Sequence, residues 1–195
     1  MSAIVDHGRF LRSFVTDPRS VGAIAPSTCA LARVITAAAR VSRGTTIVEL
    51  GGGTGSFTRV IVEEAPCDAT IISIEINPTF ADLLASRFGR VHVIEGSAER
   101  MREFLDACGC RFADCVVSGL PWAAFRDDLQ SRILEKIHAV LRPGGIFATF
   151  AYAHAAWWPS AKRFRCRLHE LFAEVALSPV VWRNIPPAFV YACVR

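Results

Sequence analysis

Residues 45–56 read Thr-Thr-Ile-Val-Glu-Leu-Gly-Gly-Gly-Thr-Gly-Ser, and this stretch decides the fold. The apolar, β-branched run from Thr45 to Leu50 predicts a parallel strand that is buried on both faces. The glycines after it predict a tight turn in which the backbone can approach a ligand closely. A helix-compatible segment begins near Ser56. Strand, glycine turn and helix together indicate the first βα unit of a nucleotide-binding α/β domain.

The remaining chain continues this alternation. Further strands are expected at 70–75, 91–95, 112–118 and 146–152, with a helix after each of them. Two last strands, at about 173–183 and 188–194, lack a crossover helix between them and should pair in antiparallel fashion at the edge of the sheet. The pattern predicts a doubly wound α/β domain.

The N-terminal part is expected to form a helical cap, residues 1–43, over the site of a core that spans 44–195, within a single compact domain. Residues 3–16 are predicted to form an amphipathic helix, which either packs on the core or lies on a membrane surface. A second helix should begin with Ser27 as its N-cap and run to about Val41.

Composition supports one globular domain with a sizeable core, since 52% of the 195 residues are hydrophobic. Two basic flanks, 1–43 and 157–195, bracket an acidic centre. If both lie on one side, they would attract an anionic partner such as lipid headgroups, a phosphate-bearing substrate or nucleic acid. The seven cysteines include no C-x-x-C pair, which predicts reduced thiols and no metal site. The N-terminus does not resemble a signal peptide, and the uncharged span 143–161 is interpreted as a turn, a buried strand and a loop.

The sequence of the glycine turn reduces the number of ligand classes that fit it. A dehydrogenase fingerprint starting at Gly51 would need glycine where Ser56 stands, and a phosphate-binding P-loop would need a lysine that is absent. The observed pattern, Glu49-x-Gly51-x-Gly53-x-Gly55, resembles motif I of the class I S-adenosylmethionine-dependent methyltransferases. A turn without a cation suits this ligand, which carries no phosphate.

The resemblance implies a set of cofactor-binding residues. Glu75 ends the second strand, where a carboxylate can accept hydrogen bonds from both ribose hydroxyls. The third strand ends in Glu95-Gly96-Ser97-Ala98, and Ser97 stands where many relatives have an aspartate that holds the adenine amino group. The expected cofactor-binding residues are Glu49, Gly51, Gly53, Gly55, Glu75, Ile76, Ser97, Ala98 and Ser118.

The fourth strand leads into Ser118-Gly119-Leu120-Pro121-Trp122, which resembles the N/D/S-P-P-Y/F/W motif of amino-group methyltransferases. The resemblance implies that Ser118 and the carbonyl of Gly119 orient the acceptor nitrogen, and that Trp122 flanks it through a cation–π contact. Tyr152, at the end of the fifth strand, either points into the same pocket or packs in the core. These four residues are the expected catalytic set. No histidine in the motifs is a clear general base.

Nearly the whole chain resembles the bacterial phospholipid N-methyltransferases and, more distantly, the ribosomal RNA adenine dimethyltransferases. The matching segments are 16–27, 49–55, 118–125, 150–152 and 183–191. The resemblance implies a Rossmann-like class I methyltransferase fold: a mostly parallel seven-stranded sheet with an antiparallel last strand and helices on both faces. It further implies methylation of phosphatidylethanolamine, and of its mono- and dimethylated forms, towards phosphatidylcholine, with S-adenosylhomocysteine as the other product. Gly52, where relatives often carry proline or another small residue, and Ser97 depart from the family pattern.

A phospholipid substrate needs a cation for its phosphate, and Arg19 and Arg183 are the candidates. The expected substrate-binding residues are Arg19, Ser27, Trp122, Tyr152, Arg183 and Asn184. An aromatic and basic helix near 157–172 is predicted to face an anionic membrane, or else to be an ordinary solvated face. Its residues of interest are Trp157, Trp158, Lys162, Arg163, Arg165 and Arg167. The expected protein is a cytoplasmic monomer that associates peripherally with the inner face of the membrane.

Two other functions remain open. The acceptor could be another amine, either a ribosomal RNA adenine or a different aminolipid, although an RNA enzyme of that type would normally bring an additional basic helical domain. DNA is not an expected partner, and RNA is disfavoured for the same reason. Alternatively, the chain could be a peripheral membrane-binding protein that holds the cofactor without turnover.

Overall fold

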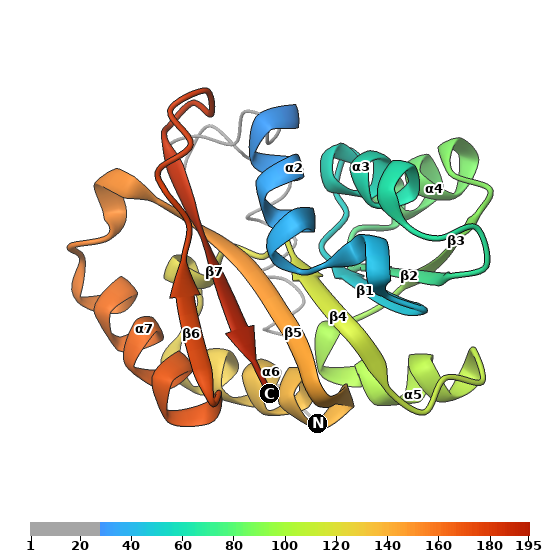
Figure 1. Cartoon of the computed structure of the whole chain (residues 1–195). Helices are drawn as coiled ribbons and strands as arrows, with labels where there is room; N and C mark the ends of the chain where they lie inside the picture. The colour runs from blue at the N-terminus through green and yellow to red at the C-terminus, as the bar shows by residue number, and fades with distance from the viewer. Residues whose placement is uncertain (1–27) are drawn as a thin grey trace.

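The computed structural model describes residues 28–195 (Figure 1). The predicted helix at 3–16, Arg19 and Ser27 lie outside the described residues. The strands are β1 Thr46–Leu50, β2 Thr70–Glu75, β3 Val91–Glu95, β4 Ala113–Ser118, β5 Leu141–Tyr152, β6 Glu174–Leu177 and β7 Ala188–Val194. The α-helices are α2 Cys29–Ala38, α3 Ser56–Glu64, α4 Pro78–Arg87, α5 Met101–Ala107, α6 Asp127–Val140 and α7 Pro159–Leu171. Short 3₁₀ turns are η1 Val41–Arg43, η2 Ala98–Arg100, η3 Trp122–Ala124 and η4 Ala153–Ala155.

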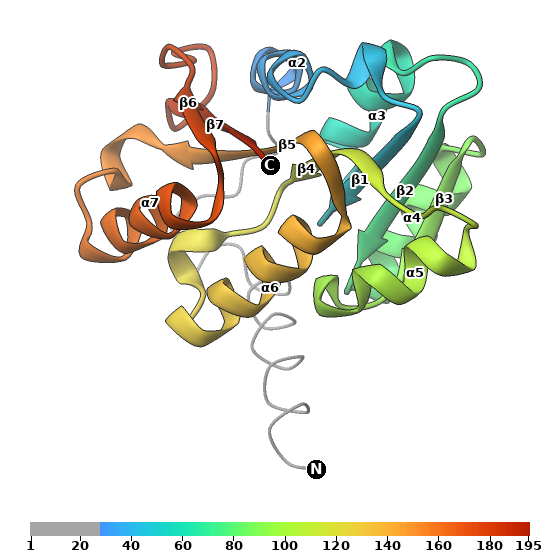
Figure 2. The same cartoon turned by 60° about the horizontal axis from the view of Figure 1, so that its bottom comes forward.

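The seven strands form one sheet in the order β3-β2-β1-β4-β5-β7-β6. All pairs are parallel except those of β7, which runs antiparallel to both β5 and β6. Helices cover both faces, with α2 and α3 on one and α5, α6 and α7 on the other (Figure 2). This arrangement confirms the predicted Rossmann-like fold.

Most element boundaries follow from local sequence signals. Asn77 caps α4 by accepting hydrogen bonds from the N–H groups of Thr79 and Phe80, and Pro78 stands at the first helical position. β2 and β3 have the predicted bounds. β6 is shorter than expected and ends at Leu177, two residues before Pro179, which lacks the N–H group that a ladder requires.

The start and end of α2 correct the prediction. Thr28, not Ser27, is the N-cap, because its hydroxyl accepts a hydrogen bond from the N–H of Leu31. The helix ends at Ala38 rather than near Val41, because Arg40 adopts a left-handed φ of 55° that cannot continue a right-handed helix.

The strand register aligns the ends of the parallel strands. Leu50 is level with Ile74 of β2 and with Ser118 of β4, and Ser118 is level with Thr149 of β5. Glu75 is level with Glu95 of β3. We call the side on which these five strands end in the parallel direction the carboxyl edge. It holds the predicted site segments that follow β1 to β5, and the loop that carries Arg183 and Asn184 lies beside it, because Ala188 after this loop is level with Tyr152 at the end of β5.

Candidate active site

The glycine turn connects β1 to α3 at the carboxyl edge. Three of its glycines have left-handed φ angles: 74° at Gly51, 54° at Gly53 and 88° at Gly55. An L-residue with a side chain rarely adopts these angles, so the turn needs glycine at each of the three positions. The N–H of Gly51 donates to the carbonyl of Ile74, which fixes the turn to β2.

Gly52 is required for a different reason, namely internal packing. A Cβ atom there would lie 2.7 Å from both Leu84 Cδ1 and Ser73 Oγ. A Cβ on Gly53, in contrast, would meet no atom of residues 28–195 within 4 Å. Gly52 therefore faces the protein, whereas Gly53 faces open space that a ligand can occupy. These two roles of glycine cannot be distinguished from the sequence alone.

Glu49 lies beneath the turn and is fully buried. Its carboxylate accepts hydrogen bonds from the hydroxyls of Thr58 on α3, at 2.8 Å, and Ser73 on β2, at 2.6 Å. Burial raises the pKa of Glu49 to about 7, although hydrogen bonds from Ser73 and Thr58 act in the opposite direction. These contacts give Glu49 a supporting role under the turn, in place of the direct cofactor contact expected from the sequence.

Glu75 ends β2, and two backbone N–H groups hold its carboxylate in place. One of its carboxylate oxygens accepts the N–H of Gly53 at 2.9 Å, and the other accepts the N–H of Asn77 at 2.8 Å. Each oxygen keeps a second lone pair, so the carboxylate is held in place and can still accept hydroxyl donors. The glycine turn and Glu75 therefore form one hydrogen-bonded unit. This unit fits S-adenosylmethionine, which has ribose hydroxyls for the carboxylate and no phosphate that the turn would have to hold.

The third-strand residues lie next to this unit. The Ser97 hydroxyl accepts the N–H of Glu99 at 3.2 Å and thereby caps η2. Ile76 and Ala98 are partly buried and pack against the core beneath the carboxyl edge. Contacts of these three residues with the cofactor remain predictions.

Ser118 has a different hydrogen-bonding role from the expected one. Its fully buried hydroxyl oxygen accepts two hydrogen bonds, from the N–H of Leu120 and from Nε1 of Trp122, both at 3.2 Å. A hydroxyl has two acceptor lone pairs and one proton, so both acceptor positions are filled and only the proton remains for a ligand. This corrects the expectation that Ser118 accepts a hydrogen bond from the substrate amine.

Trp122 also departs from its predicted role. The ring is 3% exposed and stacks on Phe164 of α7, with centroids 5.0 Å apart, while Phe125 and Phe147 contact it edge-on. The aromatic faces are used inside the core, so the ring is not available for a cation–π contact with an amine. Trp122 instead orients Ser118 through its indole N–H.

Gly119 lies directly against the glycine turn. Its N–H donates to the carbonyl of Leu50 at 2.8 Å, and a Cβ would lie 2.7 Å from the carbonyl oxygen of Gly51. The acceptor loop is thus pressed directly against the glycine turn. Within residues 28–195 the Gly119 carbonyl has no donor, so it can accept one from an amine.

Tyr152 is the last residue of β5 and lies three residues after Thr149, which pairs with Ser118. It is partly buried, with ring contacts to Phe150 and His154. Burial raises the pKa of its phenol, which therefore stays protonated at neutral pH. Its place at the carboxyl edge is compatible with either role considered above.

Asn184 corrects the expectation of a substrate contact. Its side-chain oxygen accepts hydrogen bonds from the N–H and hydroxyl of Thr28, at 3.0 and 3.1 Å, and its amide donates to the carbonyl of Pro186 at 2.7 Å. The residue is buried and ties the β6–β7 loop to the start of α2. Arg183 beside it is exposed and makes no hydrogen bond or ion pair within the described chain, so its substrate role stays a prediction.

The basic helix α7 divides into two groups. Arg163 and Arg167 pair with Asp127 at the start of α6, at 3.1 and 3.3 Å, and their place on a membrane-facing surface stays a prediction. Lys162 and Arg165 are exposed and have no ion-pair partner among residues 28–195.

Several residues with clear roles were not identified from the sequence. They are Thr58 and Ser73 under the turn, Gln130 beneath the acceptor loop, and Trp182 and Ile185 in the β6–β7 loop, which are 75% and 76% exposed. An exposed tryptophan next to the Arg183-Asn184 segment was a signal that could have been used.

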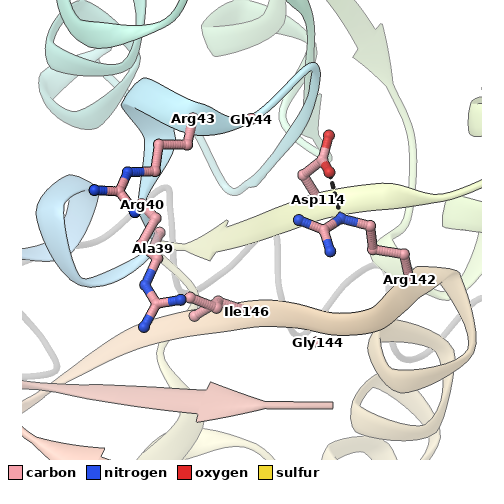
Figure 3. Close-up of a pocket in the computed structure, with 8 residues that line it drawn as sticks. All are labelled: Ala39, Arg40, Arg43, Gly44, Asp114, Arg142, Gly144 and Ile146. Carbon is pink, nitrogen blue, oxygen red and sulfur yellow. Dashed lines mark hydrogen bonds and ion pairs between the residues drawn. The ribbon is translucent and has the colours of Figure 1, made fainter.

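A depression of about 210 Å³ lies elsewhere, at the amino ends of the central strands (Figure 3). Its lining includes Arg40, Arg43 and Arg142, and Arg142 Nε contacts Asp114 Oδ1 at 2.5 Å. Asp114 and Gly144 lie near the starts of β4 and β5, so the depression is at the sheet edge opposite the glycine turn. It does not belong to the candidate active site.

The fold, the glycine turn without a P-loop lysine and the glutamate at the end of β2 define the class of S-adenosylmethionine-dependent methyltransferases. Comparison with known proteins gives the same class. Residues 47–145 match a family described as a methyltransferase domain. Over 187 residues the chain is 32% identical to an ornithine lipid N-methyltransferase of Singulisphaera acidiphila, covering 94% of this chain and 93% of that protein.

Solved structures share the fold at low identity. The O-methyltransferase TomG of Streptomyces achromogenes, in complex with S-adenosylmethionine, has a TM-score of 0.67 at 20% identity over 96% of this chain and 89% of that chain. An O-methyltransferase of Bacillus cereus, in complex with S-adenosylhomocysteine, has a TM-score of 0.66 at 14% identity over 100% and 92%. The chain belongs to the S-adenosylmethionine-dependent methyltransferases, in the same family as the ornithine lipid enzyme.

Proposed function

We propose that this enzyme transfers a methyl group from S-adenosylmethionine to the headgroup amine of a membrane aminolipid. The relative that covers 94% of the chain carries this proposal, because its name specifies both an N-methyl transfer and a lipid acceptor. Phosphatidylethanolamine, which the sequence resemblance indicates, and ornithine lipid, the acceptor in the relative's name, both present a primary amine. More specifically, we propose that the acceptor is phosphatidylethanolamine and that the enzyme methylates it towards phosphatidylcholine.

The residues of the carboxyl edge support amine transfer. The bound cofactor supplies an electrophilic methyl group on a sulfonium, and an uncharged amine must approach it. The carbonyl of Gly119 lies against the glycine turn and accepts one N–H of the amine, which orients the nitrogen lone pair. No residue of the motifs is a clear general base, and the histidine beside this edge, His154, stacks on Tyr152. In this proposal the amine loses its proton to water before transfer, and proximity supplies most of the acceleration.

An anionic membrane surface is the proposed partner. Two loops beside the carboxyl edge expose large apolar side chains: Trp157 and Trp158 before α7, and Trp182 and Ile185 between β6 and β7. The loops are joined where the N–H of Ala153 donates to the carbonyl of Pro187 at 2.8 Å. Aromatic residues favour the headgroup region, and nearby cations attract anionic lipids. The exposed cations of these loops and of α7 that have no ion-pair partner among residues 28–195 are Lys162, Arg165 and Arg183.

We further propose that the enzyme works peripherally, on the cytoplasmic face of the membrane. Within residues 28–195, no helix is long and apolar enough to cross a bilayer.

A lipid panel tests the acceptor. Purified enzyme is incubated with S-adenosylmethionine labelled in its methyl group and with phosphatidylglycerol vesicles that contain phosphatidylethanolamine, ornithine lipid or neither. Label is expected in one or both amine-bearing lipids and not in phosphatidylglycerol. Label in added ribosomal RNA, with none in lipid, would overturn the proposal.

Flotation with the same vesicles tests the membrane partner separately from catalysis. The double variant Trp182→Ser, Ile185→Ser is expected to float less than the wild type, because both side chains are removed from the proposed contact. Leu177→Ser is the matched control, since Leu177 is exposed on β6. Equal flotation of the double variant and the wild type would contradict this part.

A further inference from the structure

We propose that Gln130, held by Arg167, is a positioning residue that fixes the acceptor loop, residues 119–125, for methyl transfer. The inference rests on the proposed function, in which the carbonyl of Gly119 receives the amine. Gln130 lies on α6, outside every sequence motif, and is fully buried.

The first step is the contact between Gln130 and the loop. Its Nε2 group donates to the carbonyl of Trp122 at 2.7 Å and to the carbonyl of Phe125 at 3.2 Å. Both protons of the amide are used, and the planar amide group fixes the directions of the two hydrogen bonds relative to each other. The 3₁₀ turn at 122–124 therefore has its two ends attached to a single side chain of a regular helix.

The second step is the orientation of that amide. Arg167 of α7 donates from Nη1 to Gln130 Oε1 at 2.7 Å, which determines which side of the amide faces the loop. The same guanidinium reaches Asp127 Oδ1 at 3.3 Å. Arg167 is thus oriented by α6 and in turn orients Gln130. A glutamine with its oxygen bonded to a cation cannot rotate its amide by half a turn without losing all three hydrogen bonds.

The third step connects the loop to the reacting position. Trp122, whose carbonyl Gln130 holds, donates from its indole to Ser118, and its ring stacks on Phe164 of α7. Gly119 lies between these two residues of the loop and against the glycine turn. The N–H of Trp122 donates to the carbonyl of Leu120 at 3.0 Å, so a shift of the Trp122 backbone is passed along the loop towards the Gly119 carbonyl. The glycine turn has further supports of its own in β2 and Glu75.

Gln130 holds the acceptor loop, whereas β2 and Glu75 hold the glycine turn, and this difference predicts a specific kinetic effect. Loss of the Gln130 hydrogen bonds should weaken the use of the acceptor and leave the binding of the cofactor intact. The variant Gln130→Met removes both donors and the acceptor while keeping the size of the side chain. Its kcat/KM for the lipid amine is expected to fall about tenfold or more, since small displacements of a positioned group cost one to two orders of magnitude.

Three measurements test the proposal on the full-length protein. Calorimetric titration with S-adenosylmethionine should give Gln130→Met the stoichiometry of the wild type and a Kd within about twofold of it. Steady-state kinetics on aminolipid vesicles should show the loss of kcat/KM, and Arg167→Met should show a smaller loss of the same kind. Glu135→Gln, on the exposed side of α6, is the matched control and should behave as the wild type.

Hydrogen–deuterium exchange makes the test independent of the acceptor. Peptides covering 118–126 should exchange faster in Gln130→Met, while peptides covering 49–56 keep the wild-type rate. If the loop loosens but even the wild-type enzyme labels no lipid, the acceptor proposal fails and the positioning role stands. Unchanged exchange and unchanged kcat/KM in Gln130→Met would overturn the positioning role. Loss of cofactor stoichiometry in proportion to activity would also overturn it, by showing a role in folding alone.

Discussion

Glu49 should make the stability of this protein depend on pH in the neutral range. Burial raises the pKa of its carboxyl from 4.5 to about 7 in the folded state. Because the folded pKa is the higher one, the protonated form is favoured by folding, and the associated stability is present below about pH 4.5 and lost as the pH rises through 7. The shift corresponds to about 3 kcal/mol of unfolding free energy lost by pH 8.

The variant Glu49→Gln isolates this effect. Glutamine resembles the neutral acid, and its carbonyl oxygen can accept the hydroxyls of Thr58 and Ser73. Urea unfolding at pH 5 to 8 should show the variant gaining about 2–3 kcal/mol relative to the wild type as the pH rises. The exposed Glu174→Gln serves as control and should leave the pH dependence unchanged. A stability difference between Glu49→Gln and wild type that stays constant over this range would refute the reasoning.

Two further substitutions test the packing around the site. Gly52→Ala should lower the unfolding free energy by about 1–3 kcal/mol, because its Cβ would approach Leu84 to 2.7 Å. Gly89→Ala, whose Cβ meets no atom of the described part of the chain within 4 Å, is the matched control, and equal urea midpoints for the two would contradict this account. Asn184→Ala should cost about 2 kcal/mol in the same assay, because it leaves the N–H of Thr28 unpaired at the start of α2; a loss of lipid methylation without a loss of stability would instead restore the predicted substrate contact.

The sequence was sufficient for the fold because the deciding signals are local. The β-branched run that ends at Leu50, the glycines after it and the Asn77-Pro78 helix start each specify their own backbone conformation. The acid at the end of β2 was also placed correctly, since parallel strands bring their carboxyl ends to one edge. The N-cap of α2 was wrong by one residue because serine and threonine stand side by side and both can cap a helix.

The roles of individual side chains were predicted less well, because they depend on distant segments. Nothing near Trp122 indicates that Phe164, on a helix much later in the chain, stacks on its ring. Likewise, Asn184 resembles a substrate ligand until Thr28 is found beside it. Arg167 looks like a surface cation until its contact with Gln130 is seen. In each case, a residue distant in the sequence occupies the ring face or hydrogen-bonding group that the local motif had assigned to a ligand or to solvent.

The most direct test of the cofactor site compares Glu75 with its neighbour in the register, Glu95. Glu75 is 4% exposed and bonded to the glycine turn, whereas Glu95 is exposed at the end of β3. Calorimetric titration with S-adenosylmethionine should show that Glu75→Gln weakens binding by roughly 10- to 100-fold, the effect of losing charge-assisted hydrogen bonds. Glu95→Gln should bind as the wild type does. Wild-type affinity in Glu75→Gln would contradict the assignment of the carboxyl edge as the cofactor site.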